Sequence, residues 1–447
     1  MNDSQRVVGL RGMLIDSPEY GKLRCWRDGG LVIAGGRIAE VGDYETLSKK
    51  PRDHEVHWID SSRNVILPGL IDLHSHLPQY PAVARGESDL LPWLRQHIFP
   101  LERDFTGPKC RAGIARFFQA LASNGTTTAG VYSAIFEDSC HAAFEAARDL
   151  GIRALIGKVM MDVGSYGSHQ PRKVVSISLH ESERLCREWH GADDGRLEYA
   201  FSPRFAVSCS DKLMRGAAEL AHEHGAYLQT HLAESREEIN RVKHLFMSAS
   251  DYTDVYDSCG MLGAKTLLGH CIHLSERELD VIAERGCAIA HCPSANLFLG
   301  SGIMPLESRL ARGIPVGLGS DVAAGPELNL WRVMRAAVES QKARSFYEET
   351  GPLPGPVEAL HMATAGGARA LGKLGMLGAL EVGYDADLVV MDIAELLPYR
   401  EDISLRDDLG PEDVVSLAVY RGGRHAVVST YVRGRKIHQA ESQRNLL

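Results

Sequence analysis

Strand-like and helix-like segments alternate through the middle of this chain. Apolar runs such as "TTTAGVYS", "AYLQTH" and "KTLLGHC" alternate with segments of helical spacing such as "SDKLMRGAAELAHEHG" and "LSERELDVIAERG". In the last segment, Ser275 and Glu278 have capping-box spacing, and Gly286 is a stop signal. A β-α alternation over about 300 residues is typical of a (β/α)8 barrel. A doubly wound sheet is the main alternative, but the chain has no G-x-G-x-x-G between a strand and a helix, and no P-loop.

The two ends of the chain show strand patterns without the intervening helices. Near the N-terminus, two apolar runs flank Gly35 and Gly36, which is a hairpin signal. Near the C-terminus, "DADLVVMDI" and "AVVSTYVRGRKI" are again strand-like. We therefore predict an α/β protein in which residues 1–66 and 376–447 form one small composite β-sandwich. Residues 67–375 are predicted to form the (β/α)8 barrel domain.

Composition limits the class of protein. The chain has 447 residues, of which 44% are hydrophobic and 24% are charged, as in soluble globular proteins with a large core. The net charge of −9 argues against a nucleic-acid-binding surface. The sequence contains no membrane-spanning apolar run, and we expect no secretory signal because its first residues lack a positive region followed by an apolar run. Nine cysteines without a C-x-x-C pair are typical of a reducing compartment. We expect a cytoplasmic protein that binds neither nucleic acid nor membrane.

Polar residues occur where several predicted strands end. In a (β/α)8 barrel the active site lies at the carboxyl ends of the strands. One such residue alone would be an ordinary polar side chain at the solvated end of a strand, but several such ends together favour a shared site. Neutral imidazoles and a carboxylate form a site for Zn²⁺ or Fe²⁺ with a position left for water. The residues at these ends are His74, His76, His231, His270 and Asp321.

A metal in such a site would make water a nucleophile at neutral pH, because it lowers the pKa of bound water to about 7. A nearby carboxylate could take the proton of that water. Glu234, three residues after His231, is a candidate second carboxylate that could protonate a ring nitrogen while the adjacent carbon is attacked. The alternative for Glu234 is an acidic residue that stabilises the N-terminus of the following helix.

Several motifs resemble those of the amidohydrolase superfamily over almost the full length of the chain. They are "PGLIDLHSH", "THLAES", "GHCIHLS", "GLGSDVAAG" and the C-terminal "GALEVGYDADLVVMD". Within that superfamily, the segments "HSHLPQY", "SPRFAVSCS" and "HCPSANLFLGSG" are similar to the guanine deaminase family. The resemblance implies hydrolytic deamination of guanine to xanthine and ammonia. It also implies one divalent metal per chain, zinc or alternatively iron, and a homodimer.

The resemblance also implies a role for each site residue. The implied metal ligands are His74, His76, His231 and Asp321. The implied catalytic residues are Glu234 as proton shuttle, Asp321, and His270, which orients the attacking water. The implied substrate-binding residues are Gln79, Arg204, Phe205, His231 and Glu234. No lysine follows the apolar run in "LEYAFSPRF", so a two-metal site with a carboxylated lysine is not expected.

The chemistry of three of these residues agrees with a purine substrate. Guanine presents O6 and N7 as acceptors on one edge, and an arginine fork could serve them. The amide of Gln79 can both donate and accept, and Phe205 offers a flat face for stacking. Taken singly, Gln79 could be a loop amide, Arg204 a surface ion pair and Phe205 a core residue.

Other activities stay open at this stage. A pterin such as isoxanthopterin, or 8-oxoguanine, shares the 2-amino-4-oxo edge of guanine, and a triazine aminohydrolase or chlorohydrolase uses related chemistry. A non-catalytic scaffold would be expected to lack metal ligands, all of which are present. The roles of Trp93, His273 and His291 are also open. Trp93 could line a lid over the site, although helix packing is favoured. His273 is expected to have a structural or supporting role, and His291, which could support the pocket, is kept out of the metal set.

Overall fold

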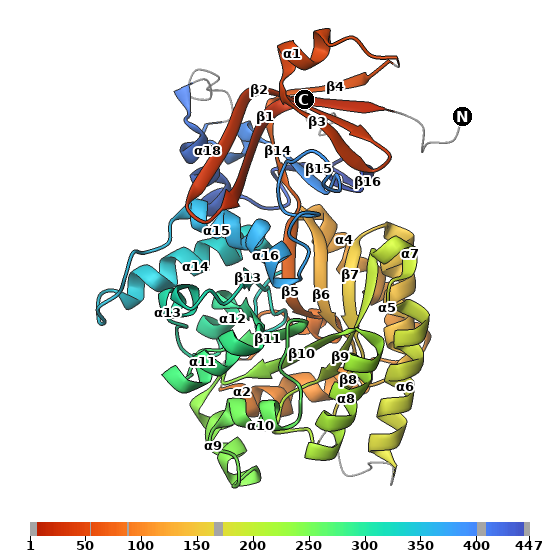
Figure 1. Cartoon of the computed structure of the whole chain (residues 1–447), viewed down its shortest axis with the longest axis vertical. Helices are drawn as coiled ribbons and strands as arrows, with labels where there is room; N and C mark the ends of the chain where they lie inside the picture. The colour runs from red at the N-terminus through yellow and green to blue at the C-terminus, as the bar shows by residue number, and fades with distance from the viewer. Residues whose placement is uncertain (1–6, 54, 87–88, 165–172, 400–407, 442–447) are drawn as a thin grey trace.

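The computed structural model describes residues 7–53, 55–86, 89–164, 173–399 and 408–441. A β-sheet built from both ends of the chain lies against one end of a larger α/β barrel (Figure 1). Parts of the predicted terminal domain, namely residues 1–6, 54, 400–407 and 442–447, lie outside the described residues. The predicted boundaries at residues 66 and 376 stay predictions.

Both termini contribute strands to one sheet. Within the described residues the sheet has seven strands in the order β16-β15-β14-β4-β1-β2-β3, and all neighbours are antiparallel except the parallel pair β1 and β4. The predicted hairpin at Gly35 and Gly36 is confirmed, since both glycines have positive φ (57° and 81°) between paired strands. The strands are β1 (Val8–Glu19), β2 (Lys22–Ala34), β3 (Arg37–Asp43), β4 (His57–Pro68), β14 (Leu388–Asp392), β15 (Val427–Val432) and β16 (Arg435–Gln439).

The terminal sheet is apolar on both faces. In β1, Leu14 packs into an apolar cluster formed within the terminal sheet, whereas Met13 and Ile15 pack into the main core shared with the barrel helices. This alternation follows the two-residue period of a strand, and it recurs in β4 and β14. Each fully buried side chain of this kind contributes about 1.5–3 kcal/mol relative to exposure, so the sheet is held firmly on the barrel.

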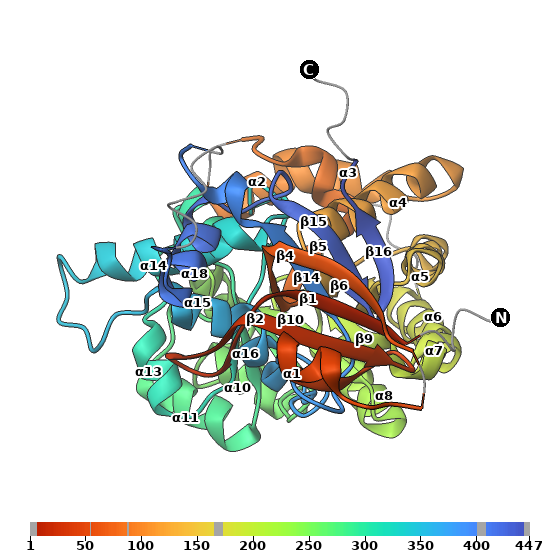
Figure 2. The ribbon, with the colours of Figure 1, turned by 90° about the horizontal axis from the view of Figure 1, so that it is seen from above.

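A second sheet closes into the barrel, and the terminal sheet lies over it in the view of Figure 2. In the described part of the chain, eight parallel strands follow the order β5-β6-β7-β9-β10-β11-β12-β13, and the short strand β8 pairs with β9. The predicted (β/α)8 barrel is therefore confirmed over a doubly wound sheet. The strands are β5 (Leu70–His76), β6 (Thr126–Tyr132), β7 (Arg153–Gly157), β8 (Val159–Met160), β9 (Leu197–Pro203), β10 (Tyr227–Leu232), β11 (Thr266–His270), β12 (Ala288–His291) and β13 (Val316–Leu318).

Backbone hydrogen bonds between β5 and the segment after β13 close the barrel. The amide of Asp321 donates to the carbonyl of His74 over 2.7 Å, and the amide of His76 donates to the carbonyl of Val322 over 3.1 Å. Because the first and last strands meet here, polar residues almost 250 positions apart in the sequence lie side by side.

Helices surround the barrel and begin and end at the expected signals. The predicted capping box of Ser275 and Glu278 is present, and Gly286 (φ 72°) ends the helix. The helices that follow barrel strands are α4 (Pro108–Ser123), α5 (Glu137–Leu150), α6 (Val174–Trp189), α7 (Ala192–Gly195), α8 (Asp211–His224), α9 (Arg236–Leu245), α10 (Tyr252–Ser258), α11 (Glu276–Arg285), α12 (Pro293–Phe298), α13 (Leu306–Ala311), α14 (Leu330–Arg344), α15 (Pro356–Ala363) and α16 (Ala365–Ala370).

Four short helical elements follow β5 and pack on the barrel rim. Trp93 and Ile98 from these elements share an apolar cluster with Phe205 and Leu299 from the loops of the barrel. None of the helices in the described ranges is long and apolar enough to cross a membrane. The rim elements are η2 (Leu77–Ala82), α2 (Leu90–Trp93), η3 (Leu94–Ile98) and α3 (Phe99–Arg103), and the remaining elements are α1 (Tyr44–Lys49), η4 (Ile393–Leu396) and α18 (Pro411–Arg421).

Candidate metal centre and active site

A β-bulge aims the first two histidines of the site. The register of β5 against β6 shifts between Asp72 and Ser75; His74 lies within the shift and His76 directly beyond it, each with only 2% of its surface exposed. Bulges commonly re-aim side chains next to active sites. The buried carboxylate of Asp72 accepts hydrogen bonds from the amides of His74 (3.2 Å) and Ser320 (2.9 Å). It thereby ties the bulged strand to the loop that carries Asp321.

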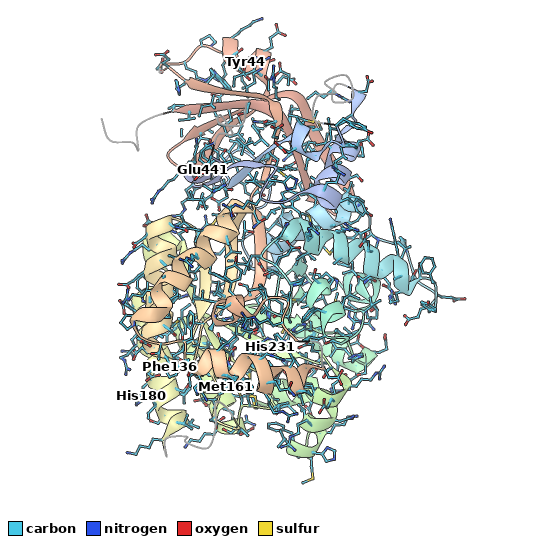
Figure 3. All side chains as sticks on the ribbon, turned by 180° about the vertical axis from the view of Figure 1, so that it is seen from behind. Tyr44, Phe136, Met161, His180, His231 and Glu441 are labelled. Atoms are coloured by element: carbon cyan, nitrogen blue, oxygen red, sulfur yellow. The ribbon has the colours of Figure 1, made fainter. Side chains whose placement is uncertain are left out.

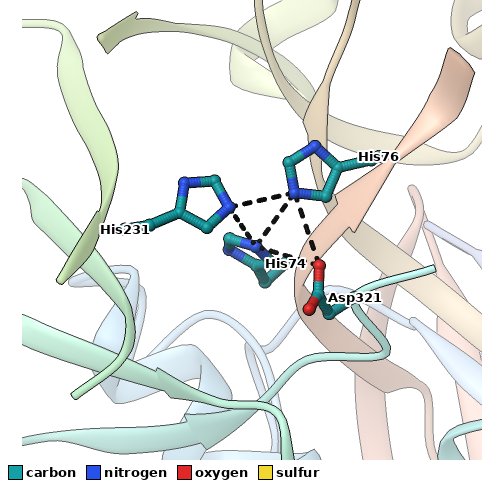
Figure 4. A group of neighbouring side chains, drawn as sticks. All are labelled: His74, His76, His231 and Asp321. Atoms are coloured by element: carbon teal, nitrogen blue, oxygen red, sulfur yellow. Dashed lines mark hydrogen bonds and ion pairs between the residues drawn. The ribbon is translucent and has the colours of Figure 1, made fainter. Parts of the chain in front are cut away.

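Three imidazoles and one carboxylate converge on one point (Figure 4). The Nε2 atoms of His74, His76 and His231 lie 3.1–3.2 Å from one another. Oδ1 of Asp321 lies 3.4 Å from Nε2 of both His74 and His76. All four side chains are buried. His231 lies within the barrel domain, away from Tyr44 of helix α1 beside the terminal sheet (Figure 3).

The donor set fits a divalent metal ion. Nδ1 of His231 lies 2.7 Å from the carbonyl oxygen of Arg204, so this nitrogen donates and Nε2 keeps its lone pair. Burial lowers the pKa of His74, His76 and His231 well below the usual value, which keeps the imidazoles neutral. Ring nitrogens this close to one another and to a carboxylate can share one cation as ligands. Three imidazoles and a carboxylate could hold zinc or iron(II).

Strained backbone positions two of the groups near this cluster. His270 (φ 65°) and Asp321 (φ 48°) have left-handed conformations, which cost a residue with a side chain about 1–2 kcal/mol. Strand β13 ends at Leu318, so Asp321 lies in the following loop and not at the end of the strand as the sequence pattern suggested. The left-handed turn directs its Oδ1 to the histidines, while Oδ2 lies 3.7 Å from Nε2 of His270.

Glu234 lies between a hydroxyl and an imidazole. Its Oε1 accepts a hydrogen bond from Oγ of Ser301 (3.1 Å), and its Oε2 lies 3.4 Å from Nε2 of His270. Burial, together with the charge of Asp321, raises the pKa of Glu234 to about 8. Burial also raises the pKa of Asp321, to about 6. The pKa of Glu234 is thus raised further than that of Asp321, so Glu234 is the better candidate for a proton donor and Asp321 for an ionised base.

A neighbouring helix fixes the backbone of Glu234. The N-cap of α9 is Ser235, and its capping box is completed by Glu238. Oε2 of Glu238 accepts the amide of Glu234 over 2.8 Å, and the hydroxyl of Tyr252 donates to its Oε1 over 2.7 Å. Glu238 thus serves the helix N-terminus, whereas Glu234 precedes the N-cap and lines the cavity beside the cluster.

The predicted substrate residues face the same cavity. Gln79 comes from η2, and Arg204 and Phe205 directly follow β9. Arg204 is buried beside Glu102 and lies over the ring of Phe99 at 5.3 Å, so it is not a surface ion pair. The full lining is His76, Gln79, Leu90, Trp93, Leu94, Arg204, Phe205, His231, Glu234, His270, Leu299, Asp321 and Ala324.

Comparison with known proteins identifies the family. The model of the amidohydrolase family matches residues 65–436. The chain belongs to the amidohydrolase family. It is 34% identical to the guanine deaminase of Escherichia coli (strain K12), over 98% of this chain and 99% of that protein.

Solved structures extend the similarity to the fold of this amidohydrolase. The E. coli guanine deaminase structure has a TM-score of 0.89 and 32% identity, over 97% of this chain and all of that one. A guanine deaminase structure from C. acetobutylicum with bound guanine has a TM-score of 0.88 and 31% identity, with the same coverage. The resemblance to the guanine deaminases found in the sequence is therefore confirmed.

The structure brings together every site residue predicted for this amidohydrolase. His74 belongs to the histidine and aspartate cluster that could hold a metal, and the other eight predicted residues line the cavity. Their individual roles stay predictions. Of the histidines left open, His273 bonds through Nε2 to the carbonyl of Ser301 (2.7 Å). His291 is buried, and neither ring nitrogen has a hydrogen-bond partner among the described residues. Trp93 lines the cavity.

Three residues that contact the predicted site residues could not be assigned from the sequence. Glu102 binds both Gln79 and Arg204, and Asn296 lies 2.8 Å through Oδ1 from Nδ1 of His270. The ring of Tyr132 stacks on His76 with the centroids 4.6 Å apart. Glu102 directly follows the apolar residues "IFPL", and a carboxylate in such a context is unusual. Asn296 lies within "HCPSANLFLGSG", one of the segments that resemble the guanine deaminase family, but nothing in that segment indicated its contact with His270.

Proposed function

We propose that this chain hydrolyses guanine to xanthine and ammonia in a metal-dependent reaction. The observation that carries the proposal is one buried cavity in which Gln79, Arg204 and Phe205 face the histidine and aspartate cluster. The near full-length similarity to guanine deaminases, one of them solved with bound guanine, supports guanine as the ring.

We propose zinc as the metal, held by His74, His76, His231 and Asp321. Zinc in such a site supplies a Lewis acid that polarises a water molecule and lowers its pKa. Four-coordinate sites of imidazole and carboxylate are typical of zinc. Iron(II) accepts the same donors, and elemental analysis of purified protein separates the two.

Asp321, Glu234 and His270 handle the protons. Asp321 is ionised and takes one proton from water as its oxygen bonds to C2 of the purine. Glu234 gives its proton to N3, and His270 holds the water through Nε2. The C2–N bond then breaks, and the amine leaves as ammonia with the proton carried by Asp321. The remaining hydroxyl proton on C2 returns to Glu234, so xanthine forms and the acid is restored.

Three residues read and hold the ring. The guanidinium of Arg204 can donate to O6, and the Gln79 amide lies beside it to meet the same edge. Phe205 packs with its ring centroid 6.4 Å from that of His231, which offers a flat wall for stacking. The amine to be released then points to the cluster.

Ammonia release and product chromatography on a panel of rings test the proposal. The panel is guanine, a pterin, 8-oxoguanine and an amino- or chlorotriazine. We expect xanthine from guanine, with a kcat/KM at least about 100-fold above that of the other rings, which corresponds to about 3 kcal/mol of discrimination. If guanine is inert while another ring is turned over rapidly, guanine is not the substrate, but the proposed hydrolytic mechanism still stands.

We also propose a reducing, cytoplasmic location and a homodimer. All nine cysteines, each within the described ranges, are free thiols, and eight of them are buried. This supports a compartment in which thiols stay reduced. The homodimer follows from the family resemblance alone, and light scattering of the purified protein at working concentration measures it.

A further inference from the structure

A buried carboxylate joins two of the substrate residues. Glu102 lies in the short helix α3 with 1% of its surface exposed. Its Oε1 accepts a hydrogen bond from Nε2 of Gln79 (2.8 Å), and its Oε2 accepts one from Nη1 of Arg204 (2.5 Å). One side chain outside the cavity lining therefore holds two side chains that line it.

These contacts fix which way round the Gln79 amide lies. A carboxylate paired with a guanidinium can only accept hydrogen bonds, so Gln79 must turn Nε2 toward Glu102. At the other end, the backbone amide of Ala323 donates to Oε1 of Gln79 over 3.3 Å. A flipped amide would place its oxygen against a carboxylate and its NH₂ against an N–H group. The donor and the acceptor that Gln79 offers the cavity are thus set by Glu102.

The same carboxylate fixes Arg204. The guanidinium is only 3% exposed and lies over the face of Phe99. A buried cation needs a buried partner, because the charge has lost its hydration. Glu102 supplies that partner and sets the direction of the fork.

We propose that Glu102 is a positioning residue that determines which ring edge the site accepts; this rests on the proposed function. The fixed Gln79 amide and Arg204 guanidinium suit a lactam edge, in which a carbonyl lies beside an N–H group. Guanine has such an edge at O6 and N1. They oppose the reversed pattern of 2,6-diaminopurine, which has an amine beside a bare ring nitrogen. Both rings carry the same 2-amino group at the reacting carbon.

The test is the ratio of kcat/KM for guanine to kcat/KM for 2,6-diaminopurine in the wild type and in Glu102→Gln. This ratio does not depend on the fraction of protein that is folded or metal-loaded, so a purely structural loss leaves it unchanged. The glutamine can donate to Oε1 of Gln79 and lets that amide turn. We expect the ratio to fall at least tenfold in E102Q. A ratio within twofold of wild type would overturn the proposal.

Two further variants separate positioning from folding. Glu278→Gln removes a buried capping carboxylate of α11 that contacts Ser275 and Thr253, and it should lower stability while leaving the ratio unchanged. Glu102→Asp keeps the charge beside Arg204 but is one methylene too short to hold both contacts. If E102Q does not fold, E102D must lower the ratio at least threefold, and an unchanged ratio overturns the proposal.

Failure of this inference differs from failure of the proposed function. A wild-type enzyme that releases no ammonia from guanine contradicts the proposed substrate. A wild-type enzyme that deaminates guanine, together with E102Q and E102D variants of unchanged ratio, contradicts only the role of Glu102.

Discussion

The hydroxyl of Ser301 donates a hydrogen bond to Oε1 of Glu234 over 3.1 Å, although 67 positions separate the two residues in the sequence. This bond holds the carboxyl group so that its other oxygen, Oε2, faces Nε2 of His270. We expect Ser301→Ala to lower kcat about tenfold with little change in KM, because the proton donor loses its orientation and not its proton. Steady-state kinetics with guanine measure this.

Ser308→Ala is the matched control for that variant. Ser308 lies on the nearby helix α13, where its Oγ donates a hydrogen bond to the carbonyl of Pro305, and it does not line the cavity. It should leave both kcat and KM within twofold of wild type. Equal losses in S301A and S308A would contradict an orienting role for Ser301.

Metal retention distinguishes the cluster from other buried histidines. His231→Asn removes one of the three converging Nε2 atoms, and we expect bound metal in the dialysed protein to fall at least tenfold. His291→Asn changes a buried histidine at the end of the next-but-one strand along the barrel, outside the cluster. It should keep about one metal per chain. Elemental analysis of both variants decides the outcome, and equal metal loss would contradict the proposed ligand set.

The protonated form of Glu234 predicts an alkaline limit to activity. Burial raises its pKa to about 8, so the proton needed by the ring nitrogen is present at pH 7 and is lost as the pH rises through about 8. We expect kcat/KM to fall about tenfold per pH unit above that point. Glu234→Gln should lower kcat by about 10²–10⁴-fold while keeping its metal. If Glu234→Gln still showed the wild-type fall in kcat/KM at alkaline pH, another group would cause that fall.

Glu238 predicts a pH dependence of stability. Burial and the neighbouring Glu234 raise the pKa of Glu238 from 4.5 to about 7 in the folded protein. A raised carboxyl pKa favours folding at low pH, and that contribution is lost as the pH rises through 7. Relative to Glu238→Gln, the wild type should therefore lose about 2 kcal/mol of unfolding free energy between pH 5 and pH 8. Urea unfolding at both pH values measures this, and a difference of the opposite sign would contradict it.

Local patterns were enough to predict the barrel. The two-residue period of the strands and the capping signals of the helices depend on neighbours in the sequence, and Ser275, Glu278 and Gly286 cap their helix as expected. The histidines at the strand ends could be found in the same way, because the strand ends themselves are visible in the local sequence pattern. Since parallel strands end at one rim of a barrel, His231 and His270 had to lie near His74.

Long-range and strained features could not be predicted in this way. The bulge between Asp72 and Ser75, and the left-handed backbone of His270 and Asp321, are imposed by packing and leave no mark in one sequence. Glu102 reaches Arg204 across 102 positions, and no spacing rule links such residues. The parts that orient the site were therefore missed, whereas the groups that are proposed to perform the chemistry were found.

The most direct test of the account follows guanine and xanthine by absorbance with three preparations of the same protein. These are the protein as purified, the protein after dialysis against a chelator, and the dialysed protein with one equivalent of zinc restored. We predict stoichiometric xanthine and ammonia from the first, less than a hundredth of that rate from the second, and recovery in the third. Undiminished conversion by the metal-free protein, or no conversion by the loaded one, would contradict the central claim.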